Sequence, residues 1–277
     1  MNFLNIDEEK IIEYLAKRLK WYVQEFAKKR NGVVALSGGL DSSVTACITV
    51  KALGKENTFV YLLPSESTPK EDIEDALELI NMLEIPKENW ETINITDIVN
   101  LVEQKVGKYD KLARGNLMAR IRMIIIHHKA RIHDGLVIGT GDKSEILLGY
   151  FTKYGDAGVD VLPIGGLYKT QVRKIAQYLK IPRRIIEKPP SPRLWPGQTA
   201  EGELMLSYDL IDSILYLRFE RWMSEEEISN VLKVNLEKVK MVTNRVKETQ
   251  HKRNLPEVFK LGFRDIGSDW RYPREWL

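Results

Sequence analysis

The residue types best suited to chemistry gather in one short loop of the 277-residue chain. Its sequence is Ser37-Gly38-Gly39-Leu40-Asp41-Ser42-Ser43. Apolar residues 33–36 before it predict a buried strand, and residues 44–53 after it predict a helix. Glycines allow a tight turn close to a ligand, and the free amides at a helix start favour an anion. The serines add hydroxyl donors, and the Asp41 carboxylate is suited to hold Mg²⁺ on phosphate oxygens. We therefore predict a turn that binds phosphates.

Two other kinds of nucleotide loop are excluded by the same residues. The loop lacks the lysine and the spacing of GxxxxGK[ST], so it is not a Walker loop. It also lacks GxGxxG, which disfavours a redox enzyme that binds NAD. An ordinary helix cap remains the simpler alternative, because aspartate and serine often cap helices. A cap needs only one such residue, however, so the combination favours phosphate binding.

The loop resembles the SGGxDS loop of the N-type ATP pyrophosphatases. That superfamily includes GMP, argininosuccinate, asparagine and NAD synthetases. In it the loop grips the pyrophosphate of ATP, and ATP is split between its α and β phosphates. The resemblance therefore implies a reaction that passes through an adenylated intermediate.

Further segments, in the same order along the chain, resemble the ammonia-dependent NAD synthetases. The longest is residues 139–156, GTGDKSEILLGYFTKYGD, which is similar to the family pattern GTxxxxE…GxxTKYGDG. The others are residues 116–123 (NLMARIRM), 162–164 (LPI), 167–172 (LYKTQV), 196–199 (PGQT) and 251–253 (HKR). Together they extend over most of residues 30–255, which makes the resemblance far more specific than one loop.

The resemblance implies a role for each matching residue. It places ATP at Leu36, Ser37, Gly38, Gly39, Leu40, Asp41, Ser42, Ser43, Thr140, Lys169 and Ser191. It places the dinucleotide substrate at Arg120, Lys153, Asp160, His251 and Lys252. It implies that Asp41 and Glu145 bind Mg²⁺ and that Asp41 and Lys169 are catalytic residues.

Physical arguments alone are weaker at the last two positions. Glu145 follows the strand predicted at 136–139, near the carboxyl edge where open α/β sheets bind ligands. Taken alone it would more often be an exposed helix glutamate. Lys169 precedes a helix predicted at 170–179, where a cation is unfavourable unless an anion is near. Without the family resemblance, an ordinary solvated lysine would be as good an interpretation as a lysine that binds phosphate.

The implied reaction amidates deamido-NAD with ammonia and yields NAD, AMP and pyrophosphate. A glutaminase of the thioester type needs a reactive cysteine. The one cysteine, Cys47, falls in an apolar helix and favours packing, so free ammonia is the expected nitrogen donor; its supply by a separate glutaminase subunit is the alternative. The family is typically homodimeric. Two rival functions are an RNA-modifying enzyme that adenylates a tRNA base and a nucleotide-binding module without catalysis.

The order of predicted elements indicates how the site is positioned. Strands at 33–36, 58–63, 90–95 and 136–139 alternate with helices at 44–53, 70–83 and 96–131. This alternation predicts a doubly wound α/β fold, with a mostly parallel sheet like that of the adenine nucleotide alpha hydrolases. We expect one domain, 1–277, in which an N-terminal helix (1–30) precedes the nucleotide-binding core (31–185). A proline-rich loop at 188–202 then leads into a helical C-terminal part (186–277), with helices at 206–219, 224–232 and 236–249.

Composition limits the partners. With 42 basic and 39 acidic side chains, the net charge of +3 is too small to indicate nucleic-acid binding. The N-terminus has no secretory pattern, and no apolar run reaches the ~20 residues of a membrane span. We therefore expect a cytoplasmic protein without nucleic-acid or membrane partners.

Three segments depart from the family or stay unassigned. Ala200 stands where the family usually has a carboxylate. Pro192 and Arg193 replace small residues, which predicts either a stiffer loop or one that becomes ordered only with ligand. Residues 262–272 are rich in arginine and aromatic side chains, and we expect them to pack against the body.

Overall fold

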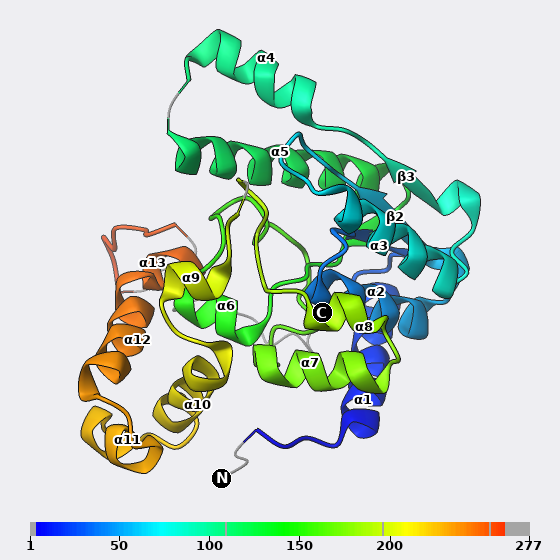
Figure 1. Ribbon diagram of the computed structural model, residues 1–277. Coiled ribbons are helices and arrows are strands. Elements are labelled where there is room, and N and C mark those ends of the chain that lie inside the picture. Colours follow the sequence, from blue (N-terminus) through cyan, green and yellow to red (C-terminus); the bar gives the residue numbers. More distant parts are fainter. Residues whose placement is uncertain (1–3, 109, 196, 255, 264–277) are drawn as a thin grey trace.

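A parallel sheet lies at the centre of the structure, a computed structural model that describes residues 4–108, 110–195, 197–254 and 256–263 (Figure 1). The strands of these residues are β1 (Asn31–Ala35), β2 (Thr58–Leu62), β3 (Trp90–Thr92) and β4 (Gly135–Val137), in the order β3-β2-β1-β4. All three neighbouring pairs are parallel, which confirms the predicted sheet. The chain moves outward from β1 to β3 and then returns to the other side of β1. In open α/β sheets such a reversal opens a crevice at the carboxyl ends of the two strands concerned.

Helices cover both faces of the sheet, as a doubly wound fold requires. Because alternate strand residues point to opposite faces, Val34 and Val60 join one core cluster while Val33 and Tyr61 join the other. The first face is covered by α1 (Glu8–Lys20), α2 (Leu40–Leu53), α3 (Lys70–Met82), α7 (Lys169–Tyr178) and α8 (Arg183–Glu187). The second is covered by α4 (Thr96–Val106) and α5 (Lys111–Ile132), which stand at the top of Figure 1.

The C-terminal helices form a lobe with its own core, yellow to red in Figure 1. They are α9 (Ala200–Leu204), α10 (Tyr208–Phe219), α11 (Glu225–Leu232), α12 (Leu236–Glu248) and α13 (Gln250–Arg253). Ser224 and Glu227 cap α11 reciprocally, a pairing that fixes the start of this helix. Leu148, the last residue of α6 (Lys143–Leu148), packs into this core and so joins the lobe to the sheet edge.

Several boundaries differ from the prediction. The helix predicted to run to residue 30 is α1 followed by a π-helix, η1 (Trp21–Phe26), and β1 already begins at Asn31. The short helices α6, α8, α9 and α13 and the 3₁₀ turns η2 (Lys55–Asn57) and η3 (Lys87–Asn89) were not predicted. Elements of three to six residues carry too few side chains to show a period.

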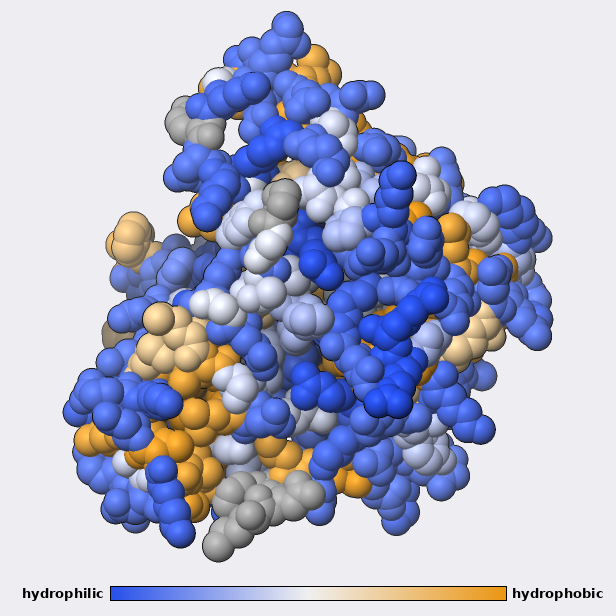
Figure 2. Space-filling model, in the orientation of Figure 1, coloured by the Kyte–Doolittle hydropathy of each residue, from blue (hydrophilic) through white to orange (hydrophobic). Residues whose placement is uncertain are grey.

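The surface in Figure 2 is mostly hydrophilic, with apolar side chains gathered over the C-terminal lobe. Of the helices in the described residues, none has the length and apolar character that crossing a membrane requires. The prediction that residues 262–272 pack on the body lies almost wholly outside the described residues, which end at Phe263.

Candidate active site

The glycine-rich loop leaves the carboxyl end of β1 and becomes the first turn of α2. Gly39 is the residue before the helix, and Leu40, Asp41, Ser42 and Ser43 lie in its first turn. The loop is braced from within: the Ser37 amide donates to Ser42 Oγ at 3.2 Å, and the two hydroxyl oxygens lie 3.0 Å apart. Ser43 Oγ donates to the Gly39 carbonyl at 2.8 Å. The predicted turn is therefore preformed, at the place where the chain topology opens a crevice.

Gly38 is the position that only glycine can occupy in this turn. Its φ is +74°, and a Cβ atom built on it would lie 2.0 Å from the Asp72 carbonyl oxygen of α3. Side chains are strained at such φ values, and glycine adopts them freely. The turn at residues 37–43, which we predict to bind phosphates and call the phosphate turn, is thus packed directly on the first turn of α3.

Lys188 fixes the same turn from the other side. Its ammonium donates to the Gly38 carbonyl at 3.2 Å and to Asp72 at 2.6 Å, and it also pairs with Asp75. Arg193 pairs with the second oxygen of Asp72 at 3.1 Å. Asp72 and Asp75 are both buried. The proline-rich loop, which begins at Lys188, is therefore tied by ion pairs to α3 and to the phosphate turn.

Four charged side chains meet between the carboxyl ends of β1 and β4. Lys169 Nζ, from the start of α7, lies 2.7 Å from Asp41, 2.8 Å from Asp142 and 2.9 Å from Glu145. Asp142 and Glu145 form the capping box of α6, which orients both carboxylates. The structure thus brings together Asp41, Glu145 and Lys169, which were predicted separately.

We call the three carboxylates, Asp41, Asp142 and Glu145, the acidic cluster. Burial shifts the pKa values of Asp142, Glu145 and Lys169. Burial raises the pKa of Glu145 well above its ordinary value, against the opposing effect of Lys169, and burial likewise raises the pKa of Asp142. Burial acts to lower the pKa of Lys169, but Asp142, Asp41 and Glu145 together raise it well above the usual value. Lys169 is therefore a firmly charged ammonium, and it is shared by three carboxylates.

The acidic cluster fits a divalent cation. Asp41, Asp142 and Glu145 each offer an oxygen, and these atoms lie within 4.8 Å of one another. Asp41 Oδ1 is buried without a hydrogen-bond partner, and Asp142 Oδ2 contacts Lys169 by charge without making a hydrogen bond. Carboxylate oxygens are the ligands that Mg²⁺ prefers. Sequence reasoning missed Asp142, although its D-x-x-E spacing with Glu145 was readable as a helix start.

Three of the residues predicted for the dinucleotide lie side by side on the surface. Arg120, on α5, donates to the Lys153 carbonyl at 3.3 Å, and Lys153 Nζ donates to the His251 carbonyl at 2.6 Å. Lys252, next to His251, donates to the carbonyls of Gly149 and Phe151 at 2.7 Å each, and burial lowers its pKa. The basic groups therefore converge where α5, α13 and the loop after α6 meet.

The remaining predicted residues are Asp160, Thr140 and Ser191. Asp160 Oδ2 accepts a hydrogen bond from the Val137 amide at 2.8 Å, at the end of β4. Thr140 stands two residues before Asp142, just beyond β4. Ser191 Oγ donates to the Gln198 carbonyl at 2.6 Å and so braces its own loop. Its hydroxyl also accepts a hydrogen bond from the Arg193 amide at 3.1 Å, so both of these hydrogen bonds stay within the proline-rich loop.

Cys47 is unsuited to nucleophilic chemistry. It is buried within α2, and burial raises the pKa of its thiol to about 12. A thiol attacks as its thiolate, so this cysteine is unreactive at neutral pH. Packing accounts for its place in the core.

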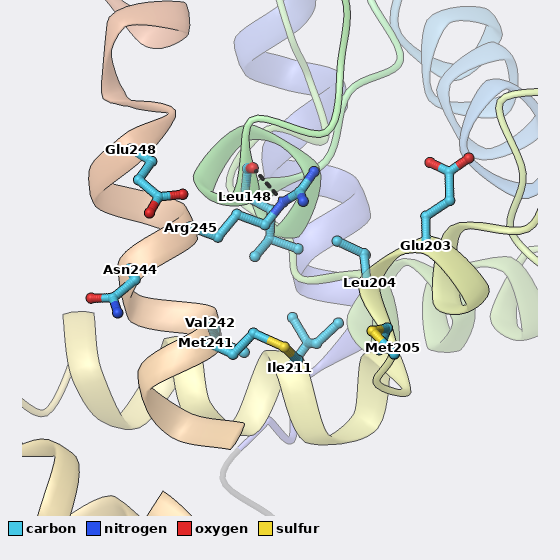
Figure 3. A pocket seen from close by; sticks show the side chains of 10 residues that line it. All are labelled: Leu148, Glu203, Leu204, Met205, Ile211, Met241, Val242, Asn244, Arg245 and Glu248. Atoms are coloured by element: carbon cyan, nitrogen blue, oxygen red, sulfur yellow. Dashed lines mark hydrogen bonds between the residues drawn. The ribbon is translucent and has the colours of Figure 1, made fainter. Parts of the chain in front are cut away.

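A separate hollow of about 340 Å³ lies on the C-terminal lobe (Figure 3). Its floor is apolar, with Leu148, Ile211 and Val242 among its lining residues. Arg245, at its edge, donates to the Leu148 carbonyl at 3.1 Å. No member of the acidic cluster lines this hollow, so the candidate chemistry lies at the sheet edge.

Comparisons with known proteins find relatives that match nearly the whole chain. A family model described as NAD synthase matches residues 11–256. An NH(3)-dependent NAD(+) synthetase of Saccharolobus solfataricus is 52% identical over 273 residues, 99% of this chain and 97% of the relative. A solved structure of NMN synthetase from Francisella tularensis superimposes with a TM-score of 0.79 at 31% identity, covering 93% of this chain and 100% of that one. An NH3-dependent NAD synthetase of Campylobacter jejuni, in complex with the nitrate ion, has a TM-score of 0.77 at 29% identity, covering 92% and 100%.

Proposed function

Because this chain belongs to the NAD synthase family, we propose that it amidates deamido-NAD with ammonia at the expense of ATP. The observation that carries the proposal is the acidic cluster with Lys169, beside a preformed phosphate turn at the reversal point of the sheet. The relatives that match nearly the whole chain are named as ammonia-dependent NAD synthetases. None of these comparisons supports the alternative of a tRNA-adenylating enzyme.

The reaction that we propose has two steps. An oxygen of the nicotinate carboxylate attacks the α phosphorus of ATP, and the bond to the bridging oxygen breaks to release pyrophosphate. Ammonia then attacks the acyl carbon, the bond from that carbon to the phosphate oxygen breaks, AMP leaves with the oxygen and the bonding electrons, and the nitrogen loses a proton. Activation is needed because a free carboxylate would have to expel oxide.

Residues of the chain hold the charged groups during the first step. The turn from Leu36 to Ser43 offers amides and hydroxyls to the β and γ phosphates, and Lys169 offers a fixed positive charge. Thr140 and Ser191 are the further ATP contacts that we propose. Asp41, Asp142 and Glu145 would hold Mg²⁺, which supplies positive charge where negative charge grows on the leaving pyrophosphate.

We assign the dinucleotide to the basic groups beyond α6. Arg120, Lys153, His251 and Lys252 supply positive charge and donors for its pyrophosphate, and Asp160 supplies an acceptor for a ribose hydroxyl. Arg120, Lys153 and Lys252 now donate hydrogen bonds to backbone carbonyls. The bound dinucleotide would replace these carbonyls as the acceptor, with little movement of the three side chains. The nitrogen donor is free ammonia, in keeping with the unreactive Cys47. A buried free cysteine also agrees with the cytoplasmic location that we propose.

The proposed reaction predicts a defined set of products. Purified protein with ATP, Mg²⁺, ammonium and deamido-NAD should release NAD, AMP and pyrophosphate in equal amounts, measured by chromatography. Chelation of Mg²⁺ should stop the reaction. Nicotinic acid mononucleotide in place of the dinucleotide tests for the activity named in the Francisella tularensis relative. Formation of ADP and phosphate would contradict adenylation.

A homodimer through the α4–α5 face is the second prediction of this proposal. Leu101 on α4 and Ile124 on α5 are 55% and 61% exposed, and Ile124 lies one turn beyond Arg120. We assign these exposed apolar side chains to the dimer interface, where a second copy would adjoin the dinucleotide residues. Light scattering should find a dimer for the wild type and a monomer for Leu101→Glu. Val231→Glu changes an exposed apolar residue of α11 and should stay dimeric; dissociation of both variants alike would contradict the assignment.

A further inference from the structure

One buried carboxylate of the C-terminal lobe is bonded to two helices of the active site. Asp212, on α10, is fully buried. Its Oδ1 accepts a hydrogen bond from Ser144 Oγ at 2.5 Å, and its Oδ2 accepts one from the Thr170 amide at 2.8 Å. Ser144 Oγ in turn accepts a hydrogen bond from the Lys169 amide at 3.0 Å. The carboxylate of Asp212 therefore has both of its oxygens engaged.

Asp212 is hydrogen-bonded to the first turns of the two helices that carry Glu145 and Lys169. Ser144 lies in the first turn of α6, between Asp142 and Glu145. Thr170 follows Lys169 in the first turn of α7. Movement of either turn would change the distances of 2.7 to 2.9 Å between Lys169 Nζ and the three carboxylates.

We propose that Asp212 is a positioning residue for the reaction, because its carboxylate locks the first turns of α6 and α7 together. Asp212 need not touch ATP or the dinucleotide; it acts through Ser144, Lys169 and Thr170. This inference rests on the proposed function, since it concerns how Lys169 and Glu145 are held for that chemistry.

The chemistry of Asp212 supports a role beyond packing. A carboxylate without a cationic partner is costly to bury, and burial raises the pKa of Asp212 to about 7, while Ser144 and Thr170 act to lower it. An apolar side chain would fill the same space at lower cost. Both oxygens of Asp212 accept a hydrogen bond from the active-site helices, which an apolar residue could not do.

Asp212→Asn tests the proposal with almost no change of volume. The amide keeps one oxygen, which can accept from the Thr170 amide, but it has no second acceptor for the Ser144 hydroxyl, so the hydrogen bond that Ser144 donates to the carboxylate is lost. We expect kcat to fall about 10- to 100-fold, the range that a displacement of ~1 Å can cost. KM for deamido-NAD should stay within about threefold, since Asp212 does not hold the dinucleotide residues.

Two further variants separate positioning from stability. Ser144→Ala removes the hydroxyl that joins Asp212 to Lys169, and it should lower kcat in the same direction. In the double variant, the fall in kcat should be smaller than the two single effects combined, because Asp212 and Ser144 are joined by the same hydrogen bond. Thr243→Val is the matched control: this buried hydroxyl also donates to a carboxylate, Glu225 at 2.6 Å, but within the C-terminal lobe. It should lower the melting temperature while leaving kcat unchanged.

The outcomes are distinguishable. A kcat of Asp212→Asn within twofold of the wild type would overturn the proposal. An equal loss of kcat in Thr243→Val at the same loss of melting temperature would also overturn it. If the wild type forms no NAD, the proposed function fails on its own. ATP–Mg²⁺ binding measured by calorimetry then still shows whether Asp212→Asn weakens the site more than Thr243→Val does.

Discussion

Replacement of Lys169 by methionine should lower kcat by roughly a hundredfold to a thousandfold, the loss typical of removing one preorganised charge stabiliser. Methionine keeps most of the length of the side chain but loses the ammonium that lies within 2.9 Å of three carboxylates. The fixed positive charge beside the phosphate turn disappears with it. Steady-state kinetics at saturating ATP, ammonium and deamido-NAD measure the effect.

Stability gives a readout of the same variant that does not depend on activity. Removing one partner of a buried ion pair costs about 3–5 kcal/mol, and here Lys169 and Asp142 are both fully buried. Added Mg²⁺ should recover part of the lost free energy of unfolding, because the cation can neutralise the same carboxylates. Lys29→Met is the control: it breaks the exposed Lys29–Asp134 pair, and such pairs contribute only about 0–1 kcal/mol. Equal effects of both substitutions on kcat would contradict the role of Lys169.

Gly38→Ala should abolish productive ATP binding. The added methyl carbon would lie 2.0 Å from the Asp72 carbonyl, at a φ of +74°, so the turn must leave either its conformation or its contact with α3. We expect kcat/KM for ATP to fall by more than about a hundredfold, since small displacements of a positioned group have effects of that size. Direct titration with ATP–Mg²⁺ checks whether binding is lost.

The matched control is Gly166→Ala. A Cβ at Gly166 meets nothing within 4 Å, and the residue is not at positive φ. Its kinetics should equal those of the wild type. If Gly38→Ala binds ATP as tightly as Gly166→Ala does, the turn at residues 37–43 does not hold the nucleotide.

Local patterns predicted the strand, turn and helix around residues 37–43 because their determinants lie within a few residues. The strand before Ser37, the glycines and the helix after them are neighbours in the chain; β1 begins two residues and α2 four residues before the predicted starts. The four strands and their parallel arrangement were predictable for a similar reason, since buried parallel strands read as short apolar runs.

The acidic cluster was only partly predictable. Asp41, Glu145 and Lys169 were predicted from motifs, but their local sequences do not indicate that the three side chains are in contact. Asp142 and Asp212 were not predicted. Asp212 looks like any polar residue of an amphipathic helix, and only the packing of α10 against α6 and α7 buries it. Lys188 was hidden in the same way, because its partners Asp72 and Asp75 belong to a helix more than a hundred positions earlier.

The contact between Asp41 and Lys169 spans 128 positions of the chain. Loop-closure entropy opposes contacts between such distant residues, so this one forms only when α2 and α7 have packed on their common face of the sheet. A chain still lacking α7, as during synthesis on the ribosome, would possess the phosphate turn but not its fixed cation. If Lys169 acts as we propose, we expect a chain without the packed α7 to bind ATP without turning it over.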